Sequence, residues 1–252
     1  MPHRFRRWLG ALLTLALATT AGAATPLPSV VLVHGAFADG SSWSRVIPRL
    51  QTRGYRVTAV QLPLTSLADD VAATRRVIDR QPGDVVLVGH SWGGVVVTEA
   101  GNAPTVKALV YLSALVPDSG ESAQGLLQRL GAPMEGLTPD AAGLIWLDDP
   151  KAFQAVMAAD LPLSTARTLA AVQKPLAARS FAEAVSHAAW RDKPSWYLVT
   201  TNDHALPPRA QRAMAAEMQA RTVTLASSHL SLASHPDRVA DLIDRVAQAQ
   251  RR

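Results

Sequence analysis

The chain alternates short apolar runs rich in β-branched residues with amphipathic stretches of helix length, starting at about Ser29. That order predicts successive strand–helix–strand units, in which parallel strands form a central sheet with helices on both faces. Residues 85–88 are continuously apolar, which is typical of a central strand buried on both faces. The fold class is therefore α/β, with strands predicted at residues 30–35, 55–60, 85–88, 106–113, 195–200 and 222–225. Helices are predicted at residues 43–53, 67–80, 92–101, 208–220 and 236–248.

The pattern changes between about residues 119 and 190. Alanine, leucine and glutamine recur there at helical spacing, and no strand pattern is evident. Hydrophobic residues make up 48% of the chain and charged residues 18%, which favours one large core. We therefore expect residues 25–252 to form one domain with an inserted helical cap.

The first 24 residues have the layout of a secretory signal peptide, with a basic start, an apolar run and small residues before the cleavage site. The apolar run, residues 8–18, is shorter than the roughly 18 residues that cross a bilayer, so we expect no stable membrane anchor. Cleavage after Ala23 or Ala24 would yield a periplasmic or secreted protein. It would also lower the formal net charge from +5 to +2 by removing three arginines and no acid. No nucleic-acid partner is expected, because no basic cluster with interleaved aromatics follows.

Residues 89–93 read G-H-S-W-G and fit the pattern G-x-S-x-G. In that pattern a serine sits on a strained turn between a strand and a helix, and the glycines leave room for it. The predicted strand before Gly89 and the predicted helix after Ser91 supply this context. Ser91 is therefore the candidate nucleophile, and the backbone N–H of Trp92 is a candidate oxyanion donor.

A second oxyanion donor is expected at the end of the first predicted strand, in the segment H-G-A-F, residues 34–37. The glycine allows the following backbone N–H, that of Ala36, to point toward Ser91. Two such donors would hold the negative charge that develops during acyl transfer.

The base must be a histidine late in the chain, because a serine hydroxyl needs an imidazole to take its proton. His229 is favoured because it lies four residues beyond Leu225, in a loop at the carboxyl edge of a predicted strand. His235 is the alternative, although it directly precedes Pro236 and is typical of a helix lead-in.

The acid is predicted to be Asp203, which lies just past the strand at residues 195–200 and completes the order Ser, Asp, His. Asp118 follows another strand at the same edge and is the alternative, although it is also typical of a helix start. We interpret His90, His187 and His204 as structural or loop residues. No metal site is expected, because the chain has no cysteine and no H-x-x-x-H pair.

With these residues in place, the chain resembles the α/β-hydrolase superfamily over nearly all of its mature length. It is most similar to a bacterial group with H-G-A-F-A-D-G-S-S-W, G-H-S-W-G-G and K-P-S-W-Y, here at residues 34–43, 89–94 and 193–197. That group is itself similar to plant salicylate methyl esterases and hydroxynitrile lyases. The resemblance implies a cofactor-free hydrolase with Ser91, Asp203 and His229 as triad and with Ala36 and Trp92 as oxyanion donors.

Two departures narrow the expected activity. Ser91 stands where epoxide hydrolases and haloalkane dehalogenases of this superfamily carry an aspartate, and Ala36 and Phe37 do not reproduce the lysine and threonine pattern of hydroxynitrile lyases. The sequence thus predicts a serine esterase for small molecules, with an apolar pocket to which Phe37 and Trp146 contribute. The alternative function is a ligand-binding protein with the same triad but without turnover.

Overall fold

The computed structural model describes residues 26–133 and 136–251. The predicted signal peptide, residues 1–24, lies outside the described residues. Within the described ranges, no helix is both long and apolar enough to cross a membrane.

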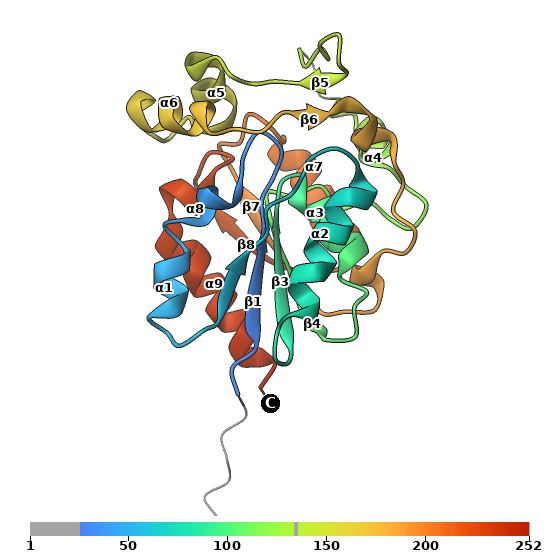
Figure 1. The fold of residues 1–252 in the computed structure, drawn as a ribbon, viewed down its shortest axis with the longest axis vertical. Helices are drawn as coiled ribbons and strands as arrows, with labels where there is room; N and C mark the ends of the chain where they lie inside the picture. The colour runs from blue at the N-terminus through green and yellow to red at the C-terminus, as the bar shows by residue number, and fades with distance from the viewer. Residues whose placement is uncertain (1–25, 134–135, 252) are drawn as a thin grey trace, which may run out of the picture.

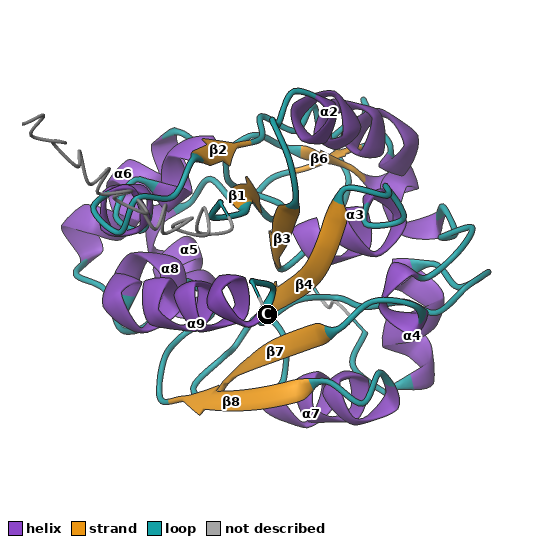
Figure 2. Ribbon diagram, turned by 90° about the horizontal axis from the view of Figure 1, so that it is seen from below, coloured by secondary structure: helices purple, strands orange, loops and turns teal. Residues whose placement is uncertain are grey.

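A six-stranded sheet forms the centre of the molecule, and every neighbouring pair of its strands is parallel. Its order, visible in Figure 2, is β2 (Val57–Ala59), β1 (Ser29–Val33), β3 (Val85–His90), β4 (Val106–Leu112), β7 (Ser195–Thr200) and β8 (Arg221–Leu225). The prediction of a mostly parallel α/β sheet is confirmed. Val33 of β1 lies beside Gly89 of β3, so the segments that follow these two strands start at the same level of the sheet.

Helices cover both faces of the sheet, as the alternating pattern predicts. α9 (Pro236–Ala249) lies on one face with α1 (Ile47–Gln51) beside it (Figure 1), and α2 (Leu67–Asp79), α3 (Gly93–Ala100) and α7 (Pro208–Glu217) lie on the other (Figure 2). The helix predicted at residues 43–53 is shorter than expected. A 3-10 turn (Gly40–Trp43) comes first, and the α-helix starts just before Pro48, because proline has no N–H and is tolerated only in the first turn.

The segment between β4 and β7 lies over the carboxyl ends of the strands, at the top of Figure 1. It contains α4 (Ala123–Arg129), α5 (Pro150–Met157) and α6 (Leu163–Ala171), with 3-10 turns at Ala178–Ala182 and Ala189–Arg191. The prediction that it has no strand was wrong, because β5 (Leu144–Ile145) and β6 (Leu176–Ala177) pair antiparallel. Two-residue strands are too short to produce an alternating pattern in the sequence.

Candidate active site

Ser91 occupies the turn between β3 and α3 in a left-handed backbone conformation, with a φ of 52°. This conformation costs a non-glycine residue about 1–2 kcal/mol, and such strain is characteristic of functional sites. The turn is held by the end of β4 and the segment that follows it: the Ser91 N–H donates to the Leu112 carbonyl (3.2 Å), and the Ser91 carbonyl accepts from Leu115 N–H (3.1 Å). A Cβ at Gly93 would lie 2.5 Å from the carbonyl oxygen of Val33, so glycine allows the turn to approach β1 this closely.

The segment after β1 runs directly beside the serine. A Cβ at Gly35 would lie 2.8 Å from the Cβ of Ser91, so only a glycine backbone can pass there. Phe37 has a φ of 56°, and Ala36 and Phe37 both line the cavity that contains Ser91. The backbone N–H groups of Ala36 and Trp92 donate to no acceptor within the described part of the chain. Both N–H groups therefore remain available to an oxyanion.

His34 fixes the loop that carries Ala36. Its Nδ1–H donates to the Gly35 carbonyl (2.8 Å), and its Nε2 accepts from Leu62 N–H (3.0 Å). Burial lowers the pKa of His34 to about 4, so the ring is neutral and has the one donor and one acceptor that these two bonds require.

The side chain of Trp92 is bonded to the buried carboxylate of Asp70, which the sequence did not single out. The indole N–H donates to Asp70 Oδ2 (2.8 Å), and Asp70 Oδ1 accepts from Leu64 N–H (2.7 Å). Burial raises the pKa of Asp70 to about 6, despite these two hydrogen bonds. Asp70 thus positions the residue next to the candidate nucleophile.

His229 and Asp203 form a buried pair, with 2.7 Å between Nδ1 and Oδ2. Oδ2 also accepts from the Thr200 hydroxyl (2.8 Å) and from the Gln211 amide (2.9 Å). Oδ1 accepts from the backbone N–H groups of residues 205 and 206 (2.9 and 2.8 Å). Every partner of this carboxylate is a donor.

Burial alone would raise the pKa of Asp203, but the interaction with His229 and the hydrogen bonds around the carboxylate outweigh it and leave the pKa below its ordinary value. An ionised Asp203 requires the proton of His229 to be on Nδ1. The Nε2 lone pair is then free to accept a proton, and Nε2 has no hydrogen-bond partner among the described residues.

Ser91 and His229 line the same cavity, although no hydrogen bond joins the serine hydroxyl to Nε2 in this structure. Catalytic hydrogen bonds are often long without substrate and tighten when it binds. The structure therefore brings the three predicted residues to one place, with the acid and base already in contact.

The main chain of His229 is held by two buried side chains. The Nε2–H of His90 donates to the His229 carbonyl (3.0 Å), and the Ser113 hydroxyl donates to the same oxygen (3.1 Å). The rings of His90 and His229 lie 4.7 Å apart between centroids. Burial, followed by the neighbouring His229 charge, lowers the pKa of His90 to about 3, so His90 is a neutral support for the His229 loop.

The cap also holds this loop, through Asp160 in the connection between α5 and α6. Asp160 Oδ2 accepts from Ser228 N–H (2.9 Å) and from the Ser227 hydroxyl (3.1 Å), and Oδ1 accepts from the Ser228 hydroxyl. The Leu230 N–H donates to the Met157 carbonyl at the end of α5 (3.0 Å). Nothing in the local sequence pairs Asp160 with residues 227 and 228, which lie nearly seventy positions away.

The alternative acid and base lie away from the cavity. Asp118 forms a salt bridge with Arg191 at the surface. His235 contacts the Ser234 hydroxyl (2.9 Å) and lies 3.7 Å from Asp160. Two further histidines are also bonded elsewhere: His187 contacts Asp192, and His204 Nδ1–H donates to the carbonyl of residue 155 (2.9 Å).

The cavity at Ser91 has a volume of about 30 Å³ and a mostly apolar lining. Phe37 lines it, and so do five residues that the sequence did not single out for the pocket: Leu115, Leu127, Phe181, Ala205 and Leu206. The expectation for Trp146 is corrected, because its side chain is 44% exposed and its indole N–H donates to Asp140 (2.9 Å). Ile145 is buried, and successive side chains in an extended segment point to opposite sides, so Trp146 faces outward.

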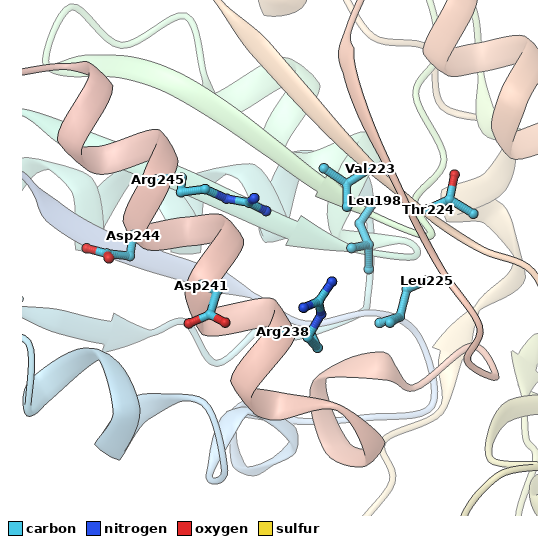
Figure 3. Close-up of a pocket in the computed structure, with 8 residues that line it drawn as sticks. All are labelled: Leu198, Val223, Thr224, Leu225, Arg238, Asp241, Asp244 and Arg245. Atoms are coloured by element: carbon cyan, nitrogen blue, oxygen red, sulfur yellow. The ribbon is translucent and has the colours of Figure 1, made fainter.

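A larger cavity of about 310 Å³ lies between β8 and α9 (Figure 3). Arg238 and Arg245 extend from α9 toward β8, whereas Asp241 and Asp244 form ion pairs with Arg53. Neither Ser91 nor His229 is among its lining residues, so this cavity is separate from the candidate site.

Comparisons with known proteins place the chain in a family. The model of the alpha/beta hydrolase family matches residues 30–242. The alpha/beta hydrolase nvfD of Aspergillus novofumigatus is 27% identical over 87% of this chain and 96% of its own length. A pyrethroid hydrolase of Sphingobium wenxiniae is 28% identical over 87% of this chain and 88% of its own length.

The crystal structure of a pyrethroid hydrolase from Sphingobium faniae has the same fold, with a TM-score of 0.76 at 22% sequence identity. The alignment covers 89% of this chain and 98% of that one. Because the family model spans most of the chain, including the Ser91 turn and the His229 loop, this protein belongs to the alpha/beta hydrolase family.

Proposed function

We propose that this protein is a serine hydrolase that cleaves carboxylic esters of small, apolar molecules through an acyl-enzyme intermediate. The observation that carries the proposal is the shared cavity, which is lined both by Ser91 on its strained turn and by His229 of the His229–Asp203 pair. The hydrolase relatives support the reaction class, and the motifs shared with methyl esterases favour carboxylic esters.

In the first step, His229 Nε2 takes the proton of the Ser91 hydroxyl while Oγ attacks the ester carbonyl carbon. The carbonyl oxygen becomes an oxyanion and accepts hydrogen bonds from the N–H groups of Ala36 and Trp92. Each such donor contributes about 3–4 kcal/mol of transition-state stabilisation. The bond to the alcohol oxygen then breaks, and His229 gives its proton to the leaving alkoxide.

In the second step, a water molecule loses a proton to His229 and attacks the carbonyl carbon of the acyl-enzyme. The acid is released, and the proton returns to Ser91. Throughout the cycle the ionised Asp203 keeps the Nδ1 proton of His229 in place and stabilises the imidazolium.

The test is a comparison of wild-type protein with Ser91→Ala, with Ser44→Ala as a control serine on the exposed surface. Wild-type protein should hydrolyse p-nitrophenyl acetate and be labelled by a fluorophosphonate, whereas Ser91→Ala should lose about a millionfold in kcat and all labelling. Hydrolysis that persists in Ser91→Ala would refute the proposal. Stabilisation by an ester without turnover or labelling of the wild-type protein would favour the ligand-binding alternative.

We further propose that residues 1–24 direct export of the protein. The full chain, expressed in a bacterium, should appear in the periplasm or medium with a mature N-terminus at Ala24 or Thr25, as measured by intact mass. A full-length cytosolic product would contradict this proposal.

A further inference from the structure

The cavity at Ser91 is small for a binding site. Its volume of about 30 Å³ compares with the roughly 300–1,000 Å³ that is typical of pockets for drug-sized ligands. It can hold the reacting carbonyl and a small group, but a larger ester would need additional space.

Such space exists immediately beyond it. A second cavity, with a volume of about 320 Å³, lies within the cap, between α4 and the β5–β6 pair. None of the described side chains that line it is charged, and Leu137, Pro139 and Ile145 give it an apolar wall. Leu127 and Phe181 line both cavities, so they form the partition between them.

The partition consists of side chains from two separate segments. Leu127 is buried on α4, and the Phe181 ring packs edge-on against Trp92, with 5.5 Å between the ring centroids. Apolar packing of this kind has no strong directionality, and rotamer changes of partly buried rings are fast compared with turnover. Phe181, which is only partly buried, is therefore the part of the partition that can rotate.

The backbone that carries Phe181 is fastened to the core on both sides of the ring. Before it, Ala177 N–H donates to the Leu64 carbonyl (2.9 Å) and Arg179 donates to the Thr65 carbonyl (2.8 Å). After it, the Glu183 carboxylate accepts from the N–H of Leu67 (2.8 Å) at the start of α2. These bonds hold the segment in place, so the opening comes from side-chain rotation and not from lifting of the cap.

We propose that the substrate site has two compartments, with the reacting carbonyl in the inner cavity and a long apolar arm of the same ester in the outer cavity. Leu127 and Phe181 are the partition that the arm displaces, and they determine which ester lengths are accepted. The inference rests on the proposed ester hydrolysis and extends it to a substrate class: uncharged esters with one small and one extended apolar arm.

Three esters test the idea in a pH-stat assay: methyl acetate, methyl octanoate and octyl acetate. We expect wild-type protein to hydrolyse at least one long ester with a kcat/KM about tenfold or more above that for methyl acetate. Phe181→Ala should raise this long-to-short ratio further, by about tenfold. Ala178→Trp, which fills the outer cavity, should lower the ratio by about tenfold or more.

Trp146→Ala is the matched control, because it removes a large aromatic side chain from the same cap but one that lines neither cavity. Its ratio should stay within about twofold of wild type. Thermal unfolding checks that each variant is folded, and Ala178→Leu replaces Ala178→Trp if the larger side chain prevents folding. A wild-type preference for methyl acetate, or equal ratios in all variants, would overturn the proposal.

Binding separates this inference from the proposed chemistry. In Ser91→Ala protein, calorimetry gives the Kd of methyl octanoate and of octyl acetate, and the Kd of the tighter-binding ester should rise by about tenfold or more when Ala178→Trp is added. That result would support the outer compartment even if the wild-type protein proved not to hydrolyse esters. An unchanged Kd would overturn the compartment and leave the proposed hydrolysis untouched.

Discussion

Replacement of Asp203 by asparagine changes only one atom of the side chain, but the surroundings of that side chain contain hydrogen-bond donors alone. Asparagine must point its NH2 group toward one of the two positions that the carboxylate oxygens occupy. At the Oδ1 position, the NH2 meets the backbone N–H groups of residues 205 and 206, which cannot turn away. Both hydrogen bonds would be lost there.

At the Oδ2 position, two of the three partners can adapt. The Thr200 hydroxyl can rotate and accept, and His229 can move its proton from Nδ1 to Nε2. The Gln211 amide is less free, because its oxygen already accepts from the Thr200 N–H (2.9 Å). Only one contact is lost on this side, so we expect the NH2 group to face His229.

The protonated Nε2 then cannot take the proton of Ser91. In serine proteases, the same exchange leaves the geometry intact but lowers kcat about 10⁴-fold, which corresponds to about 5.4 kcal/mol. We expect a loss of that size in Asp203→Asn, with little change in KM because Asp203 is not among the residues lining the cavity. The loss of charge-assisted hydrogen bonds should also lower the free energy of unfolding by about 1–3 kcal/mol.

Steady-state hydrolysis of p-nitrophenyl acetate measures kcat and KM, and nitrogen chemical shifts of selectively labelled histidine report the His229 tautomer. Asp118→Asn is the control, because Asp118 is the alternative acid and pairs with Arg191 at the surface. It should keep kcat within about twofold of wild type. The reasoning fails if Asp203→Asn retains kcat within tenfold of wild type, or if His229 keeps its proton on Nδ1.

Two further predictions concern carboxylates outside the triad, Asp160 in the cap and the buried Asp70. Asp160→Ala removes the hydrogen bonds that join residues 227 and 228 to the cap. We therefore expect kcat to fall about 10- to 100-fold, with a smaller change in KM. An unchanged kcat in folded protein would contradict a positioning role for Asp160. Burial raises the pKa of Asp70 from 3.8 to about 6, so the native state retains a proton that the unfolded chain releases, and stability falls as pH rises through this window. Relative to Asp70→Asn, wild type should therefore lose about 2.5 kcal/mol of unfolding free energy between pH 4 and pH 7, as measured by urea unfolding. Parallel stability curves for the two proteins would contradict this.

The strands and the serine turn could be predicted from the sequence because their causes are local. The strand at residues 195–200 has the predicted bounds, since a buried parallel strand needs a continuous apolar run and leaves one in the sequence. The turn at Ser91 could also be predicted locally. Its glycines stand where a Cβ would collide with neighbouring backbone, so the need for glycine is visible in the sequence itself.

From the sequence, the candidate acids and the candidate bases could be compared only by how closely each follows a predicted strand. In the structure, the pairing of His229 with Asp203 follows from the sheet, where β7 and β8 lie side by side and end at the same level. The same holds for Gln211, which reaches Asp203 because α7 packs on β7. No spacing along the chain encodes either contact.

The cap is the part of the chain whose contacts the sequence predicted least. The sequence predicted an apolar pocket, but which residues of the cap face that pocket depends on how short segments dock against the core. Trp146 faces solvent, whereas Phe181 lies against Trp92 and Asp160 holds the loop of His229. The sequence alone determined the parallel sheet and the strained serine, since local sterics and periodicity produce both. Only the tertiary structure decided which residues line the pocket and which residues hold the loop of His229, because those contacts join segments far apart in the chain.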